Sequence, residues 1–173
     1  MKTALGVMLT LTARLVLIAL ATMVHSASGA GELREMLELD LWFPGSSFHI
    51  PGRVPVNVQL KNISAETIVV NKAYNFQDCK LEFHIVTPSG RVPEQVLILK
   101  GRRPPLGPGD FKTLRPGGVF QTEVDLAEWF QLTEVGSYKV EAEYWNGHAG
   151  KQGGRTVWIG KIRSATRTFE LTK

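Results

Sequence analysis

Apolar and polar side chains alternate along much of the chain, in short runs separated by turn residues. Between residues 120 and 126, and again between 138 and 144, every second side chain is apolar or small while its neighbours are charged or amide-bearing. A period of two places alternate side chains on opposite faces of a strand. Between these runs, the apolar group around Trp129 has no such period. We therefore expect two half-buried strands, joined by one helical turn that plugs an end of the core with Trp129.

Similar short runs occur through the rest of the chain, with turn residues such as Pro51-Gly52 and Pro88-Ser89-Gly90 between them. This spacing, without a long amphipathic helix, is typical of an all-β, immunoglobulin-like antiparallel β-sandwich of seven to nine strands. The further strands are expected at 36–43, 54–60, 66–71, 79–86, 96–100 and 168–171, and a short apolar segment at 155–162 precedes the last of them.

Two residues in these runs are predicted to be structural. Tyr138 follows Gly136 by two residues and opens a strand, as in the tyrosine corner of Greek-key sandwiches; the alternative is an ordinary core tyrosine. Cys79 is in phase with the apolar Leu81 and Phe83, so we expect a buried, inert thiol. Because it is the one cysteine of the chain, it has no intramolecular disulfide partner.

The N-terminus has the layout of a secretory signal peptide. Lys2 and Arg14 precede an apolar run at 15–24, and small residues follow up to Ala30. We expect residues 1–30 to be a leader and 31–173 to be the β-sandwich domain, secreted or periplasmic and without stable membrane insertion. Cleavage after Ala27 fits nearly as well as cleavage after Ala30, and an uncleaved anchor is the alternative.

The charge balance excludes one class of partner. The leader takes two of the 20 Lys and Arg residues and none of the 16 acidic ones, which leaves 18 against 16 and a net charge of +2. A nucleic-acid-binding domain carries a larger positive excess. We therefore expect no nucleic acid partner.

Several fold motifs resemble those of secreted bacterial Ig-like modules. Their order is similar to the non-catalytic N-terminal β-sandwich of aspzincin-type metalloendopeptidases, and the Leu-x-Pro-Gly turn is also similar to that of intracellular proteinase inhibitors of bacilli. The resemblance implies a fold and no chemistry, because the chain contains no His-Glu-x-x-His motif. The motifs are 56–64, 114–117, 124–126, 136–140, and 158–164 running into 168–171.

Catalytic and metal-binding patterns are weak. His49, His84 and His148 do not have the spacing of metal ligands, and Glu141 and Glu143 fall on the polar face of a strand. We expect no catalytic residue, no metal and no cofactor, and a protein that is not an enzyme.

Two connections remain as candidate contact surfaces. The Pro- and Gly-rich loop at 101–110 carries Arg102 and Arg103, and the Gly-rich connection at 146–158 carries His148. Trp145 falls on the outward phase of its strand and Trp158 lies beside the connection, although both also fit packing against the core or beneath the loop. The basic residues of the chain could form one positive surface, or they could be ordinary solvated side chains. They are Arg102 and Arg103 of the loop together with Lys100, Lys151, Arg155, Lys161, Arg163 and Arg167.

The sequence thus favours a monomeric, non-enzymatic binding module for an unknown protein or glycan. Its contact residues would be Arg102, Arg103, Trp145, His148 and Trp158. The alternative is a peptidase inhibitor that presents the loop at 101–110 as a rigid, extended bait.

Overall fold

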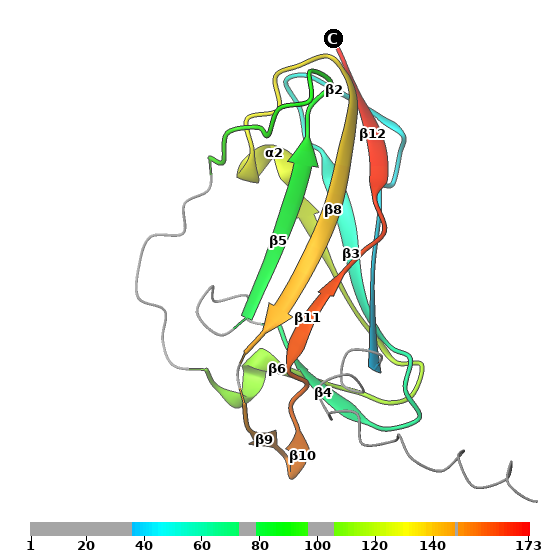
Figure 1. Cartoon of the computed structure of the whole chain (residues 1–173), viewed down its shortest axis with the longest axis vertical. Coiled ribbons are helices and arrows are strands. Elements are labelled where there is room, and N and C mark those ends of the chain that lie inside the picture. Colours follow the sequence, from blue (N-terminus) through cyan, green and yellow to red (C-terminus); the bar gives the residue numbers. More distant parts are fainter. Residues whose placement is uncertain (1–35, 73–78, 97–105, 148) are drawn as a thin grey trace, which may run out of the picture.

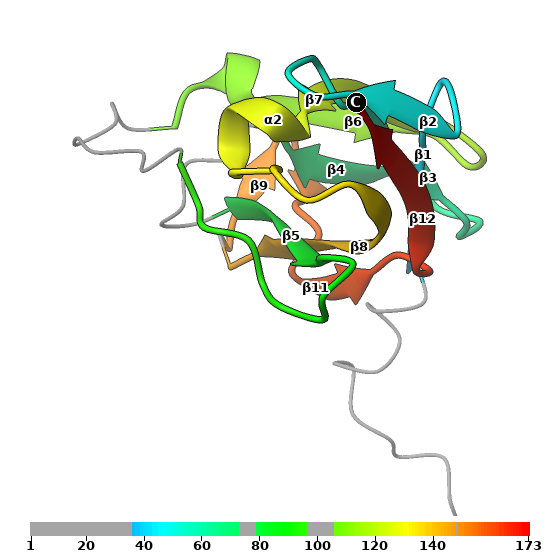
Figure 2. The same ribbon diagram turned by 90° about the horizontal axis from the view of Figure 1, so that it is seen from above.

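Two antiparallel sheets lie face to face, with the core between them (Figures 1 and 2). The computed structural model describes residues 36–72, 79–96, 106–147 and 149–173. The first sheet has the order β1–β3–β7, with β3 in the centre. Its strands are β1 (Leu37–Trp42), β3 (Pro55–Asn62) and β7 (Val119–Asp125).

The second sheet is built around β8, the longest strand. On one side β8 pairs with β5, and on the other side it pairs first with β12 and then with β11. The short strand β2 adds to β12 in parallel, at the end of the sandwich where the chain terminates (Figure 1). The strands are β2 (Ser47–His49), β5 (Cys79–Val86), β8 (Gly136–Asn146), β11 (Gly160–Arg163) and β12 (Arg167–Thr172).

Smaller elements gather at the two ends. The α2 turn connects β7 to the segment before β8 at the end that carries the C-terminus, while two short ladders, β4–β6 and β9–β10, lie at the opposite end (Figure 1). A single bridge from Val69 to Val157 joins these two ladders. The elements are β4 (Ile68–Asn71), η2 (Pro108–Asp110), β6 (Phe111–Leu114), α2 (Leu126–Trp129), β9 (Lys151–Gln152) and β10 (Arg155–Thr156).

The predicted alternation is confirmed where it was clearest. Every second side chain of β1 and β3 is buried, as are the inward side chains of β8. Burying one such Leu or Val side chain stabilises the fold by about 1.5–3 kcal/mol. Buried apolar side chains from both sheets therefore stabilise the all-β sandwich. The inward-facing side chains are packed in this core.

Tyr138 forms the predicted tyrosine corner. Its hydroxyl donates to the carbonyl of Glu134 at 2.9 Å and accepts from the N–H of the same residue at 3.0 Å, while its ring stacks on Phe169 at 5.1 Å. Burial raises the pKa of the Tyr138 hydroxyl, against the lowering effect of the Glu134 N–H. The ring of Trp129, which is partly buried, meets that of Phe83 edge-on at 5.5 Å.

Asn62 ties the end of β3 to β6 and to the connection between β3 and β4. Its amide nitrogen donates to the carbonyls of Glu66 and Leu114, at 2.6 and 3.0 Å, and its oxygen accepts from the N–H and hydroxyl of Ser64. The side chain is fully buried. Both halves of the carboxamide are therefore satisfied inside the fold.

The structure corrects one prediction about the Pro-rich loop. Pro108–Asp110 is not extended but forms the single 3₁₀ turn η2, in which the carboxylate of Asp110 accepts from the N–H of Gly107 at 2.8 Å. Residues 101–105 of the loop, all but Val96 of the strand predicted at 96–100, and the leader 1–30 lie outside the described residues. The Cys79 thiol lies outside the described side chains.

Candidate functional site

Trp158 is not an exposed contact residue, contrary to the contact role that the sequence interpretation gave it; it packs against the core, which was the alternative. Only 1% of its surface is exposed, and its ring stacks on Tyr144 at 5.6 Å. The backbone N–H of Trp158 donates to the carbonyl of Val69, and the backbone carbonyl of Trp158 accepts from the side chain of Asn146. The physical reason is that β10 turns the chain back over the end of the core, so the indole fills the space between the sheet and β4.

Trp145 remains a candidate, since it is partly exposed on the outer face of β8. Lys80 and Lys161 flank it on the neighbouring strands, and the Lys80 ammonium lies 5.7 Å from the ring centroid. On the other side, a Cβ on Gly147 would come within 2.5 Å of the indole, so the ring packs closely on that residue. Trp145 is thus a fixed aromatic platform beside cations.

Exposed cations gather at the end of the sandwich that carries the two short ladders. Lys72 follows β4, Lys112 belongs to β6, Lys151 to β9 and Arg155 to β10 (Figure 1). None of these four, which we call the basic end, forms an ion pair within the described part of the chain. Arg102, Arg103 and His148 lie outside the described residues.

The predicted positive surface is divided. Lys151 and Arg155 belong to the basic end, whereas Arg167 donates to the carboxylate of Asp40 at 2.8 Å and to the carbonyl of Leu41. Arg167 therefore ties β12 to β1. Lys161 and Arg163 are engaged with an acidic residue on the outer face of the second sheet.

A hollow of about 390 Å³ opens at the basic end, next to β10. Ile68, Val157 and Trp158 provide buried apolar walls, and Arg155 and Glu66 bring charged side chains to its lining. A concave site with apolar walls and a few polar groups is the usual form of a binding pocket.

The acidic residue that engages Lys161 and Arg163 is Glu143, which the sequence interpretation placed on a solvated face. It does lie on the outer face, but it is only 3% exposed. Lys161 and Arg163 on β11 contact its two oxygens at 2.8 and 2.6 Å. Burial alone would raise the pKa of Glu143, but these hydrogen bonds outweigh it and lower the pKa.

Glu82, His84 and Glu143 have ligand atoms within 4.8 Å of one another, a set that the spacing of the histidines did not reveal. The alternation of side chains in the sequence could have predicted that Glu82 and His84 share one face of a strand. That Glu143 lies beside them follows only from the register between β5 and β8, which the sequence does not show. A metal ion would have to displace Lys161 or Arg163 from Glu143. Because a dication would also be repelled by both cations, this cluster is better explained as a charge network.

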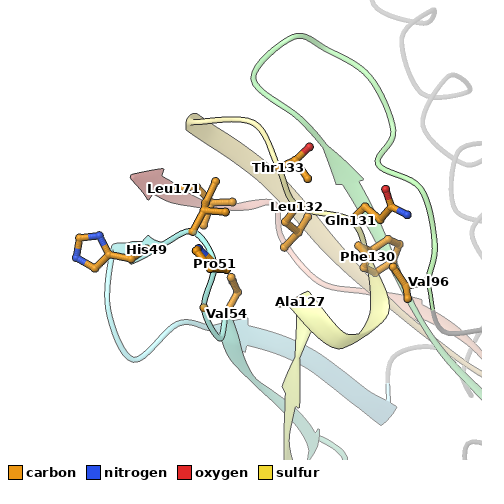
Figure 3. A pocket seen from close by; sticks show the side chains of 12 residues that line it. His49, Pro51, Val54, Val96, Ala127, Phe130, Gln131, Leu132, Thr133 and Leu171 are labelled. Atoms are coloured by element: carbon orange, nitrogen blue, oxygen red, sulfur yellow. The ribbon is translucent and has the colours of Figure 1, made fainter. Parts of the chain in front are cut away.

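A second hollow, of about 310 Å³, lies at the opposite end, between the β2–β3 connection and α2 (Figure 3). Val54, Phe130, Leu132 and Leu171 surround it. Among the residues that line it, His49 is the one titratable group, so the hollow offers neither a set of metal ligands nor a charged anchor.

No family model and no curated protein matches the chain. Among solved structures, the chain is similar to the CARDB domain of the PF1109 protein from Pyrococcus furiosus, a structure described as a complex with di-metal ions. The two are 12% identical over 78% of this chain and 91% of that domain, with a TM-score of 0.40. This likeness is distant, and the chain's own strand pairing defines the sandwich. The predicted relation to aspzincin-type N-terminal domains stays a prediction.

No helix in the described part of the chain has the length and apolar character needed to cross a membrane.

Proposed function

We propose that the chain is a secreted or periplasmic, non-enzymatic β-sandwich module that binds an anionic partner, an acidic protein segment or an acidic glycan, at its basic end. The observation that carries the proposal is the group of four exposed cations, Lys72, Lys112, Lys151 and Arg155, without an acidic ion-pair partner among the described residues.

The local geometry supports this reading. The β4–β6 and β9–β10 ladders, bridged through Val69 and Val157, hold the cations on short paired strands. The adjoining hollow adds apolar walls, and Arg155 and Glu66 are the charged residues in its lining. Clustered cations of one sign attract an anionic partner over several ångströms, and a hollow beside them supplies an anchor that simple charge attraction lacks.

Charge reversal with a matched control tests the proposal. Heparin and a poly-glutamate peptide serve as model acidic glycan and acidic protein. Lys151→Glu combined with Arg155→Glu should weaken binding of at least one probe by about tenfold or more. Lys139→Glu combined with Lys173→Glu changes the net charge equally at the other end and should leave binding nearly unchanged.

Two results would contradict the proposal. Wild-type protein that binds neither probe at low salt would remove the basic end as a binding surface. Equal losses in both double variants would show that only overall net charge matters.

The location is tested separately. Protein expressed from the full-length sequence should appear in the periplasm or medium, with an intact mass that begins at Ser28 or Gly31. A mass that retains residues 1–30 would contradict the predicted leader.

A further inference from the structure

The outer edge of β5 is a row of backbone groups that the described fold leaves open. β5 pairs with β8 along its whole length, and no strand in the described ranges pairs with its other edge. In an antiparallel ladder, successive residues direct their N–H and C=O groups to opposite sides. The orientation of β8 therefore determines which groups of β5 are free.

Ser164 fixes that orientation. The N–H of Ala142 donates to the Ser164 hydroxyl at 3.0 Å, and the N–H of Ser164 donates to the Ala142 carbonyl at 2.9 Å. Because Ser164 lies on the β11–β12 side, Ala142 directs its groups away from β5. Its neighbours Glu141 and Glu143 must direct theirs toward β5.

The register then divides β5 into two sets. Glu82 lies opposite Glu143, and His84 lies opposite Glu141, so the backbone groups of Glu82 and His84 face β8. Those of the residues between and beside them face the open edge. A regular strand with such free groups is a template for another strand. The free groups belong to Leu81, Phe83 and Ile85.

We infer that a second copy of this chain docks on this edge, with the two β5 strands antiparallel about a two-fold axis at Phe83. This register places Leu81 opposite the second copy's Ile85 and Phe83 opposite the second copy's Phe83. The open N–H and C=O groups of Leu81, Phe83 and Ile85 then find partners in one ladder. The inference departs from the monomer expected from the sequence.

The outer side chains select this register over its neighbours. With the axis at Phe83, Glu82 lies opposite the second copy's His84, and the contact occurs twice. A carboxylate facing an imidazole can accept its N–H, whereas an axis at Glu82 would place two carboxylates against each other. An axis at His84 would leave Glu82 opposite the apolar Val86. Glu82 and His84 have exposed fractions of 41% and 46%, so both are accessible.

The same register covers an exposed apolar side chain. Val86 is 40% exposed and would lie opposite the second copy's Lys80, whose methylene stem can pack on it. Existing contacts compete weakly: Lys80 reaches Glu82 only at 3.6 Å, and His84 lies 3.8 Å from a Glu143 that already has two closer cations. An interface of one strand edge is small, so we expect a concentration-dependent, reversible dimer.

Sedimentation velocity over a concentration series tests the inference on protein expressed from the full-length sequence and purified in the form that the host produces. Wild-type protein should show a monomer–dimer equilibrium. Glu82→Lys and His84→Glu should each weaken the dimer by about tenfold or more, because like or poorly matched groups then meet twice. The double variant has opposite charges across the axis again and should recover to within about threefold of wild type. The control Glu38→Lys, on the first sheet, should change nothing.

Hydrogen exchange provides a readout that does not depend on variants. The amides of Leu81, Phe83 and Ile85 should gain protection as concentration rises, while those of Glu82 and His84 are protected at every concentration by β8. Three results would overturn the inference. The protein could stay monomeric at about millimolar concentration. The dimer affinity could be unchanged by both single substitutions, or the double variant could fail to regain it.

Discussion

At the scale of single residues, the buried Asn62 side chain should contribute clearly to stability through its hydrogen bonds. Asn62→Ala leaves the carbonyls of Glu66 and Leu114 without the donors that they have in a buried setting. We expect the free energy of unfolding to fall by about 1–3 kcal/mol. Chemical denaturation measures this, with Asn57→Ala as a control on the same strand, where the side chain makes only a 3.4 Å contact with Gln121. Equal effects of the two substitutions would contradict the central role of Asn62.

Glu134 should make the stability of the fold depend on pH in the acid range. Hydrogen bonds from Ser89, followed by those from Arg91, lower the pKa of Glu134 from 4.5 to about 2. A carboxyl group whose pKa is lower in the folded state stabilises the fold above its unfolded pKa. This contribution is lost as the pH falls from about 4.5 through about 2. The melting temperature should therefore decline less steeply over that range in Glu134→Gln than in wild type, and parallel curves would contradict the assignment.

Trp158 and Trp145 provide a paired test of which aromatic residue is structural. Trp158→Ala removes a ring that is 1% exposed and stacked on Tyr144, so it should lower the free energy of unfolding by about 3–5 kcal/mol. Trp145→Ala removes a partly exposed ring and should cost clearly less. Thermal and urea denaturation of both variants measure the difference, and a larger loss for Trp145 would contradict the described packing.

At the scale of elements, Glu143 links β8 to β11. Glu143→Ala leaves Lys161 and Arg163 without their shared carboxylate, but both cations are more than half exposed and can turn to water. We expect a loss of about 1–2 kcal/mol, below the cost of stranding fully buried charges. Faster hydrogen exchange should be concentrated in β11. Glu141→Ala, two residues away on the same strand, is the matched control; equal exchange in the two variants would argue against a specific link.

The strands themselves were largely predictable, because alternation of side chains reports directly which face is buried. The clear periods at 37–41, 56–60 and 138–144 became strands with those faces inward. Pairing between distant strands was not predictable in the same way. Glu143 lies on the polar face as expected, yet β11 covers it, and only the register of β8 with β11 reveals that.

The errors at the candidate site have a similar cause. Trp158 lies between β10 and β11, where no period indicates a face, so the Gly-rich neighbourhood suggested exposure that the fold does not provide. The Pro-rich segment suggested an extended chain, but Asp110 closes η2 through its contact with Gly107. Proline and glycine restrict the backbone without choosing between a turn and an extended loop.

At the scale of the whole molecule, the two ends of the sandwich differ in character. One end carries Lys72, Lys112, Lys151 and Arg155 on short paired strands around a hollow. At the other end, Arg53 is paired with Asp125 and Glu123, and Arg91 with Glu134, so these two arginines are already neutralised. Lys139 and Lys173 also lie at that end, but neither lines the hollow there. This difference is the reason for proposing that an anionic partner meets one end rather than the whole surface.

The most direct test of that central claim is a ¹⁵N-resolved NMR titration of the protein with heparin, followed by the poly-glutamate peptide, at low and then physiological salt. The account predicts that shifted amides cluster at Lys72, Lys112 and the β9–β10 hairpin, and that the shifts shrink as salt rises. Shifts that centre on α2 and the β2–β3 connection, or no shifts with either probe, would contradict it.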